Sequence, residues 1–591
     1  MIERRAQGYL SAGYEQARLC HMRSARETEF LNLPFKQKLE FLYGLPARQK
    51  RDLILSAPEA ERLVQSFSPE TLFYTLKEIG AADAGDLLSL ALPEQVKSLF
   101  DLDCWDKDRP NLERMREWIE ALSEAGRRRL ADGLMELDVE LVSLLMREYI
   151  RVHRVDDPSA ADDAPSNRYV QFDEHYLIEF LRYDSITQPL QEFLEEAFER
   201  DYTYFAALME ECYWGVQAEL EEQAYQSRRA RLEDRGFPEY FEAQDVFAYI
   251  EPARFEEIRR RYEKPSRAGL LDEGETIPPD FALSASGRNS LFNAALAAGF
   301  AADGQRQLRT EMALVANQVL VARQIDFGNP EAVRSAIGTT HDYLNLALEH
   351  LAAGELATAV EHLKDTHLKL LFRLGVSLTL DLRKRAQATL ERLGLNAKQG
   401  REVAYLDSPY REALAGMLER QPRFYAGLDG SGALEMRDFG AMRDLHLCYA
   451  ILEEIEATAE LLLQMLGLDI ASQAFRATVA GTEVRLSQIL LTALARMALE
   501  GRTVPTPIEA SRLDELRRAI MTTERRPAEL RPQFRSAVEA ILAERLDERT
   551  RARSANFVNS CLNILEDEFA HLDPDEIPDP RFIRSVMLAR G

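Results

Sequence analysis

The sequence predicts an all-α protein: a unit of short helices in a superhelical repeat, followed by further helical units, with at most one minor β-hairpin. Apolar residues recur at spacings of three and four along most of the chain, as in Leu130, Leu134, Leu137 and Leu141, which is the periodicity of a buried helix face. Alternating apolar and polar runs are rare. Hydrophobic residues make up 46% and charged residues 29% of the chain, which fits a soluble globular protein and excludes collagen-like and disordered classes.

The N-terminal region shows a repeated helix opener. Pro58-Glu59, Pro69-Glu70 and Pro93-Glu94 each precede apolar residues at helical spacing, and Ala82-Asp83 stands where a further opener is expected. Proline suits the first position of a helix, where its missing N–H would be unpaired, and glutamate favours the positive end of the helix. Ser68 is placed to cap the helix that starts at Pro69. The pattern predicts short helices that bury their apolar faces against neighbours.

This pattern of Pro-Glu followed by regularly spaced leucines, from about Leu33 to Leu102, resembles the helical repeat domain at the cytosolic N-terminus of MgtE-type magnesium transporters. The resemblance implies that fold for the N-terminal unit. In the transporters it also implies magnesium sensing by acidic surfaces, but no membrane part accompanies the unit here, so no metal residue is carried over. The whole chain is similar to an uncharacterised family of large bacterial helical proteins. This similarity rests on the run Asp101–Trp105, the segment Arg228–Pro238 and the great length of the chain, and it implies no known activity.

Length and linkers divide the chain further. Its 591 residues exceed one domain of about 100 to 200 residues. Two segments lack a helical pattern that could bury apolar surface, and we expect them to be linkers. The first is residues 154–167, which are rich in Asp, Ala and Pro, and the second is residues 265–283, which are interrupted by Pro and Gly. We therefore expect a short-helix repeat domain over 1–153, an acidic-aromatic helical domain over 168–264 and a C-terminal helical domain over 284–591.

One hairpin is expected inside the C-terminal domain. Residues 424–439 hold two short apolar arms around Asp429-Gly430-Ser431-Gly432, which is turn chemistry. The glycines and the serine also resemble a phosphate cradle, but a turn is favoured because neither a preceding strand nor a following helix start is evident.

The charge balance and the cysteines limit location and partners. Asp and Glu exceed Lys and Arg by 26, so the surface field repels a phosphate backbone and nucleic acid is not expected as a partner. The longest uncharged stretch found, Asn289–Ala302, is shorter than the roughly 18 to 20 residues of a membrane span, and no secretory signal is indicated. The five scattered cysteines predict reduced thiols in the cytoplasm.

The sequence offers little support for a catalytic site. The chain has no Gly-Lys dipeptide for a P-loop, no H-E-x-x-H and no G-x-S-x-G, so no catalytic, cofactor-binding or metal residue is assigned and no cofactor is expected. Four histidines crowd one region: His341, His350, His362 and His367. His341-Asp342 with neighbouring carboxylates is typical of a metal-dependent phosphohydrolase, yet that signature also needs a histidine upstream of the pair, in the same unit. The hydrolase hypothesis is therefore kept as the alternative.

The clearest functional signal is a segment rich in acidic and aromatic residues. Ten acids lie between Gln191 and Ala224 against Arg200 alone, and aromatic residues are interleaved with them. This pattern is typical of a helix pair with an aromatic core and a solvated acidic face. The sharper hypothesis is a docking face for a basic protein partner, with charge from Glu195, Glu196 and Glu199 and anchors at Tyr213 and Trp214.

The sequence therefore favours a non-catalytic helical scaffold or protein-interaction protein, because helical arrays present extended surfaces. The metal-dependent phosphohydrolase is the alternative, and a divalent-cation sensor that uses acidic helix faces is the second alternative.

Residues 227–264 are neutral, with nine Lys and Arg against nine Asp and Glu, and predict local pairing of charges on helix surfaces.

Overall fold

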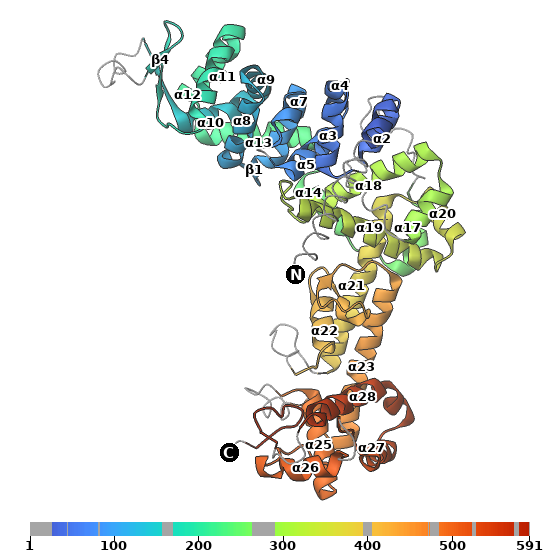
Figure 1. Cartoon of the computed structure of the whole chain (residues 1–591). Helices are drawn as coiled ribbons and strands as arrows, with labels where there is room; N and C mark the ends of the chain where they lie inside the picture. The colour runs from blue at the N-terminus through green and yellow to red at the C-terminus, as the bar shows by residue number, and fades with distance from the viewer. Residues whose placement is uncertain are drawn as a thin grey trace, which may run out of the picture. The chain divides into compact units, whose positions relative to one another are not determined.

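The computed structural model describes residues 26–43, 45–80, 83–155, 169–262, 290–393, 405–470, 472, 484–522, 527–572 and 578–589. By packing, the chain divides into two compact units (Figure 1). The first holds residues 1–248, 259–344 and 354–372, and the second holds residues 249–258, 345–353 and 373–591. Both are mostly helical, which confirms the predicted fold class.

The first unit opens with short helices. They are α2 (Phe35–Tyr43), α3 (Ala47–Ser56), α4 (Ala60–Gln65), α5 (Pro69–Ile79), α6 (Gly85–Leu88), α7 (Pro93–Asp103), α8 (Leu112–Glu124), α9 (Arg127–Glu136) and α10 (Val139–Tyr149). Alternate helices pack on one another, α3 on α5, α5 on α7 and α7 on α9. A row of this kind is what the repeated openers predict, because each helix buries its apolar face against the next.

Two of the predicted openers start helices as expected. Pro69 and Pro93 are the first residues of α5 and α7, and the Ser68 hydroxyl accepts a hydrogen bond from the Thr71 N–H at 3.2 Å. Pro58-Glu59 lies in the turn before α4 instead, and Ala82 lies outside the described residues. The apolar anchors behind the openers are all buried: Leu63, Val64, Leu72, Phe73, Leu76, Leu87, Leu88, Val96, Leu99 and Phe100.

Further helices complete the first unit. They are α11 (Thr187–Arg200), α12 (Tyr202–Trp214), α13 (Gln217–Asp234), α14 (Tyr240–Ala243), the 3-10 helix η2 (Gln244–Phe247), α17 (Leu291–Gly299), α18 (Ala302–Ala322) and α20 (Leu356–Asp365). α11 extends the row by packing on α9, while α12 and α13 pack on α10. Helices α19 (Pro330–Ala352) and α21 (Leu368–Arg392) contribute residues to both units.

The expectation of at most one β-hairpin is wrong, because the first unit holds two further small sheets. β1 (Trp105–Asp106) pairs with β2 (Arg109–Pro110), and β5 (Tyr176–Phe180) lies between β3 (Ile150–Arg154) and β4 (Tyr169–Gln171), all antiparallel. The β3–β5 register runs from Ile150 opposite Phe180 to Arg154 opposite Tyr176. This sheet joins residues on both sides of the predicted linker 154–167. Residues 156–168 and all of the predicted linker 265–283 lie outside the described residues, and the three-domain division stays a prediction.

The second unit contains the one hairpin that the sequence predicts. β6 (Phe424–Tyr425) pairs with β7 (Met436–Arg437), with Phe424 opposite Arg437. Gly430 and Gly432 in the connection have φ of +77° and +80°, which only glycine adopts freely and which explains why the turn uses them. The hairpin between residues 424 and 439 is therefore confirmed.

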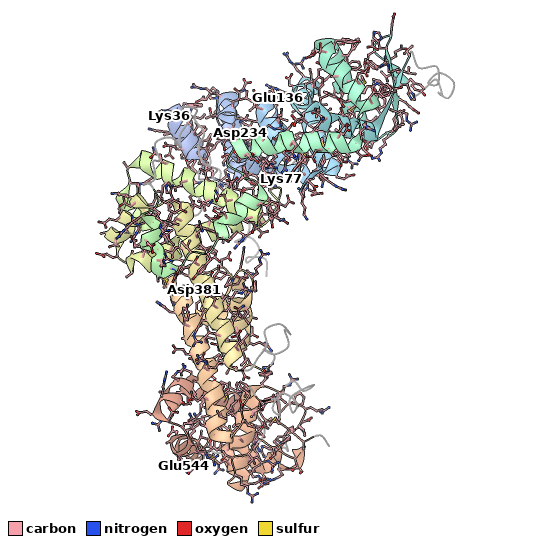
Figure 2. All side chains as sticks on the ribbon, turned by 180° about the vertical axis from the view of Figure 1, so that it is seen from behind. Lys36, Lys77, Glu136, Asp234, Asp381 and Glu544 are labelled. Atoms are coloured by element: carbon pink, nitrogen blue, oxygen red, sulfur yellow. The ribbon has the colours of Figure 1, made fainter. Side chains whose placement is uncertain are left out.

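Helices of very different length form the rest of the second unit. They are η3 (Pro252–Arg254), α15 (Phe255–Arg259), α22 (Tyr410–Leu418), η7 (Ala426–Leu428), α23 (Met442–Leu466), α25 (Leu486–Glu500), η8 (Ala510–Arg512), α26 (Leu513–Ile520), α27 (Pro532–Arg545) and α28 (Glu548–Ala570). α23 packs on α28 and α25 packs on α26. Figure 2 shows the side chains along these helices, with Glu544 on α27 among the exposed ones.

None of the helices within the described residues combines the length and the apolar character that a membrane crossing requires.

Candidate partner-binding surface

Helix α11 carries the three predicted acidic residues of the docking face. Its buried face consists of Pro189, Leu190, Phe193, Leu194 and Ala197, so the glutamates fall on the opposite, outer side. Arg127 of α9 holds two of them, with its Nη1 3.1 Å from the Glu195 carboxylate and its Nε 2.9 Å from the Glu196 carboxylate. Glu199 is exposed. Two of the three predicted glutamates are therefore held by one arginine inside the chain, which offsets one of their charges.

The aromatic residues of α11 and α12 divide into a core and an outer end. Phe193 and Phe205 are fully buried, and Phe198 meets Phe205 edge-on with ring centroids 5.3 Å apart. Trp214, the last residue of α12, is 66% exposed. The aromatic core that the sequence pattern suggests is present, and Trp214 does not belong to it.

The structure separates the predicted acids from the predicted anchors. Glu199 lies at the C-terminal end of α11, next to the start of α12, whereas Tyr213 and Trp214 end α12. At 1.5 Å per residue, the axis of α12 puts about 18 Å between its first and last residues. Tyr213 and Trp214 themselves lie together, with ring centroids 4.6 Å apart at 81°. The five predicted residues therefore do not form one patch.

A different set of acids surrounds Trp214. We call residues 211–222, which join the end of α12 to the first turns of α13, the α12–α13 corner. Four glutamates lie in it, Glu211, Glu219, Glu221 and Glu222, and the segment has no Lys or Arg. Within the described residues, no ion pair connects any of the four to a basic side chain: Gln217 donates to Glu221 at 2.8 Å and Gln226 donates to Glu222 at 2.7 Å. The corner combines unpaired negative charge with an exposed indole.

The corner is fixed firmly in the unit. The Arg147 guanidinium of α10 donates a hydrogen bond to the Gly215 carbonyl, and Leu220 and Ala224 of α13 are buried. Cys212, at the start of the corner, is also buried, and that burial raises the pKa of its thiol to about 12. An exposed tryptophan on such a well-packed frame loses little conformational freedom on binding, which favours recognition.

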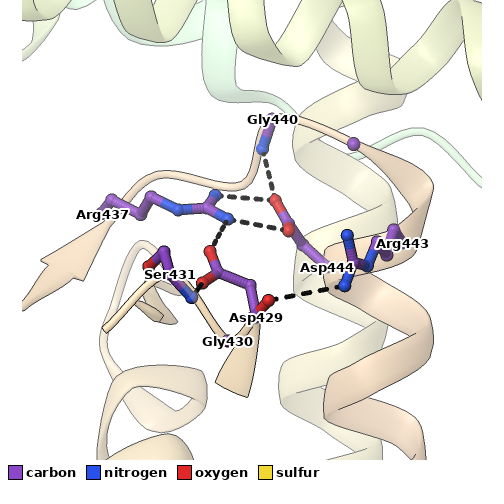
Figure 3. A pocket seen from close by; sticks show the side chains of 8 residues that line it. Asp429, Gly430, Ser431, Arg437, Gly440, Arg443 and Asp444 are labelled. Atoms are coloured by element: carbon purple, nitrogen blue, oxygen red, sulfur yellow. Dashed lines mark hydrogen bonds and ion pairs between the residues drawn. The ribbon is translucent and has the colours of Figure 1, made fainter. Parts of the chain in front are cut away.

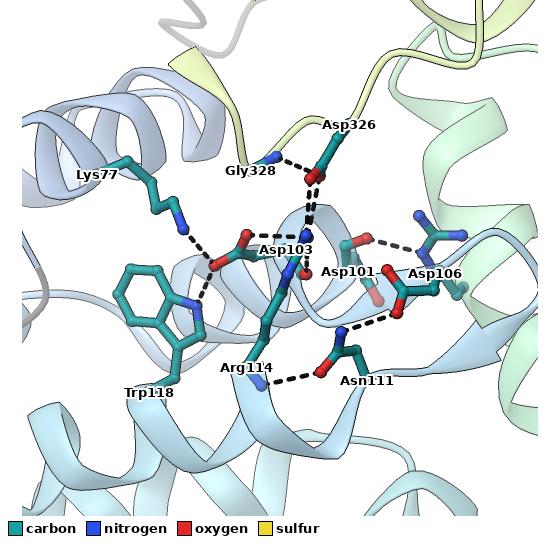
Figure 4. Close-up of polar contacts among 10 residues, drawn as sticks. Lys77, Asp101, Asp103, Asp106, Asn111, Arg114, Trp118, Asp326 and Gly328 are labelled. Carbon is teal, nitrogen blue, oxygen red and sulfur yellow. Dashed lines mark hydrogen bonds and ion pairs between the residues drawn. The ribbon is translucent and has the colours of Figure 1, made fainter.

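A buried ion cluster lies elsewhere in the first unit, and Figure 4 shows its part around Asp103. Arg231 of α13 donates to both oxygens of Asp101 at 2.8 Å and to both oxygens of Asp138 at 3.0 and 2.7 Å. Arg228 donates to the Asp101 carbonyl at 2.7 Å, and its guanidinium lies 5.0 Å from the centre of the Trp105 ring. Burial lowers the pKa of Arg228 to about 10. The two segments that suggested family membership, Asp101–Trp105 and Arg228–Pro238, thus contact each other.

That contact corrects one expectation about residues 227–264. Local pairing holds for Arg229, which lies 2.8 Å from Glu233, and for Arg254, which lies 3.0 Å from Glu257. It is wrong for Arg228 and Arg231, whose partners lie more than 90 residues away. Helix periodicity offered a signal for this, because Leu220, Ala224, Arg228 and Leu232 share the buried face of α13.

Asp103, two residues further on in α7, is held by three side chains. Its Oδ2 accepts from the Lys77 ammonium at 2.9 Å and from the Trp118 indole N–H at 2.8 Å, and the Arg114 Nη1 lies 3.6 Å from its Oδ1. Arg114 also binds Asp326 at 2.7 Å. Each buried carboxylate here has a cation beside it, so the cluster is arranged to hold α5, α7, α8 and α13 together.

The hairpin in the second unit lines a pocket of about 500 Å³ (Figure 3). Arg437 binds Asp444 at 2.7 and 2.9 Å and Asp429 at 3.1 Å. The Asp429 carboxylate also accepts the Ser431 N–H at 2.8 Å, and these hydrogen bonds lower its pKa to about 2. With Arg443 on the rim, the charged side chains that line the pocket balance in sign, which gives it no preference for an anion or a cation.

His341, the centre of the hydrolase alternative, is 1% exposed. Its Nε2 lies 3.2 Å from the Ser290 hydroxyl, its Nδ1 lies 3.4 Å from Asp342, and its ring meets Phe292 edge-on at 5.4 Å. Within the part of the chain that the structure describes, no group of three or more His, Cys, Asp or Glu is placed to hold a metal ion. His341 makes the contacts of a core histidine, and the hydrolase hypothesis stays a prediction.

Comparison with known proteins gives a family and no function. No curated protein and no solved structure matches the chain. The similarity to an uncharacterised family is confirmed, while the resemblance of the N-terminal unit to the MgtE repeat domain stays a prediction. One family model, described as a family of unknown function, matches residues 27–589, and the chain therefore belongs to that family, DUF6178.

Proposed function

We propose that this chain is a non-catalytic helical scaffold that binds a protein partner, and that it works in the cytoplasm. One observation carries the proposal: Trp214 is 66% exposed on a helix pair in which Phe193 and Phe205 are fully buried. Tryptophan is enriched among the residues that dominate binding energy at protein interfaces. The stacked helices α3, α5, α7, α9 and α11 support the proposal, because arrays of this kind present broad surfaces.

The finer resemblance of residues 1–153 to the MgtE repeat domain belongs to this proposal as a statement about fold. The helices that begin at Pro69 and Pro93 support it. We take no magnesium-binding role from it. The divalent-cation sensor stays a second, separate hypothesis, which a magnesium titration followed by thermal unfolding tests, since a ligand selective for the folded state raises its stability.

Affinity purification from the native cell tests the proposal, with the tagged full-length chain and two matched variants. Trp214→Ala removes the exposed indole, and Phe582→Ala removes an aromatic side chain of similar exposure, 70%, in the second unit. We expect a stoichiometric protein partner with the wild type and with Phe582→Ala, and its loss with Trp214→Ala. Equal recovery with both variants, or recovery of the chain alone in every case, would contradict the proposal.

A further inference from the structure

The charge near Trp214 identifies the class of partner. Arg127 pairs with both Glu195 and Glu196 on α11, whereas Glu211, Glu219, Glu221 and Glu222 at the α12–α13 corner carry no ion pair within the described residues. Arg147 is the basic residue placed at the corner, and it binds a backbone carbonyl there. The glutamates without an ion pair at the corner therefore lie beside the exposed indole, whereas two of the glutamates on α11 are already held by Arg127.

The geometry of the corner suits a short segment of chain. Glu211 precedes Trp214 by three residues on α12, so the two side chains are neighbours on one helix face. Val216, which is 55% exposed, directly precedes α13, and Glu219 and Glu222 follow within about 9 Å along the helix axis. Both glutamates are exposed. An apolar spot formed by Trp214 and Val216 thus lies beside carboxylates within the reach of a few residues of a partner.

We propose that the α12–α13 corner binds a basic segment of a partner protein, in which Lys or Arg side chains alternate with apolar ones. This inference rests on the proposed function and names the partner's chemistry. Lysine or arginine pairs with the free glutamates, and one cation lies over the Trp214 ring, because tryptophan offers the strongest cation–π surface among the aromatic side chains. An apolar side chain of the segment covers Val216.

Charge argues against the other occupants. A second copy of the chain carries the same net charge of −26 and is repelled by it. A membrane surface with anionic lipids and a nucleic acid are repelled for the same reason. A basic segment is attracted by the field of the whole molecule and then fixed by local contacts.

The full-length chain supplies its own reporter for the test. Trp105 and Trp118 are 6% and 2% exposed, against 66% for Trp214, so a collisional quencher in solution acts chiefly on Trp214. The probe is a synthetic amphipathic peptide of leucine and lysine, and its counterpart has glutamate in place of lysine. We expect the lysine peptide to bind in a one-to-one ratio and to protect Trp214 from quenching, and the glutamate peptide to do neither.

Two double variants separate local binding from attraction by net charge. Glu219→Gln with Glu222→Gln alters the corner, and Glu539→Gln with Glu544→Gln alters two exposed glutamates on α27, so each pair removes two charges from the same protein. Peptide binding to the corner variant should weaken about three- to thirty-fold, and binding to the α27 variant should change less than about two-fold. With a labelled peptide, Trp214→Ala should weaken binding more than about ten-fold.

Equal weakening by the two double variants, or equal binding of the two peptides, would overturn the inference. These outcomes are distinct from a failure of the proposed function. A native partner whose recovery depends on Trp214, together with peptide binding that ignores the corner variant, would keep the proposed function and refute the basic segment. Circular dichroism of each variant verifies that it is folded.

Discussion

Replacing Arg231 with methionine tests the ion cluster that joins α7 to α13. Methionine keeps the apolar stem and removes the four hydrogen bonds to Asp101 and Asp138. Asp101 is 1% exposed, so its carboxylate would be left buried without its cation. Removal of one partner of a buried ion pair costs about 3–5 kcal/mol, and we expect the lower part of that range because the Arg231 side chain is itself 26% exposed.

Urea unfolding followed by tryptophan fluorescence measures this loss, since all three tryptophans lie in the first unit. With an m-value of about 3 kcal/mol/M, the midpoint should fall by about 1 M. Arg229→Met is the control on the same helix, where Arg229 makes exposed pairs with Glu233 and Glu239 and where we expect a much smaller loss of stability.

The comparison of Arg231→Met with Arg229→Met tests whether the ion cluster stabilises the first unit. If Arg231→Met lowers the urea midpoint no more than Arg229→Met does, the cluster contributes no more to stability than an exposed ion pair does. Adding Asp101→Asn to Arg231→Met should recover part of the lost stability, because it removes the uncompensated buried charge. Further loss in the double variant would also refute the reasoning.

Three further predictions follow from buried contacts. Gly328→Ala should destabilise the first unit by about 1–3 kcal/mol in urea unfolding, because the added Cβ would lie 2.1 Å from the Asp103 carboxylate, and an unchanged midpoint would argue against that contact. The pKa of the Cys212 thiol is raised to about 12, so only about one part in ten thousand should be thiolate at pH 8. We expect Cys212 to resist iodoacetamide until urea unfolds the chain, and rapid labelling of the folded chain, measured by mass spectrometry, would contradict its burial. Asp444→Ala removes the acceptor of Arg437 and of a backbone N–H, so hydrogen exchange at the start of α23 should rise about ten-fold, and wild-type exchange there would show that the contact is dispensable.

Local signals in the sequence were sufficient for the helix starts at Pro69 and Pro93 and for the hairpin. Ser68 and Pro69 act through neighbours within one turn, and Gly430 and Gly432 supply backbone conformations that few other residues adopt. Such features depend on a few adjacent residues, so a sequence pattern contains all the information needed to predict them.

Pairing over long distances was not predictable in the same way. β3 follows α10 with no turn residue between Tyr149 and Ile150, so no sequence signal marks the point where the helical pattern ends and the strand begins. Its partner β5 begins more than 20 residues after β3 ends. Arg231 meets Asp101 across 130 residues. Its charge is balanced locally in the sequence, which favoured the wrong partner.

The surface that we propose for docking differs in part from the one that the sequence predicts. Both include Trp214, but nothing in the spacing of α11 distinguishes a glutamate bound by Arg127 from an unpaired one. Exposure and ion pairing depend on how α9 and α13 pack, and only the folded structure provides them.

Site-specific photo-cross-linking in the native cell tests the central claim most directly. A photoreactive amino acid replaces Trp214 in one variant of the full-length chain and Phe582 in another. The account predicts one defined cross-linked protein from position 214, with a Lys- or Arg-rich segment at the attachment point, and none in common with position 582. The same products from both positions, or no product from position 214, would contradict a partner-binding surface at the α12–α13 corner.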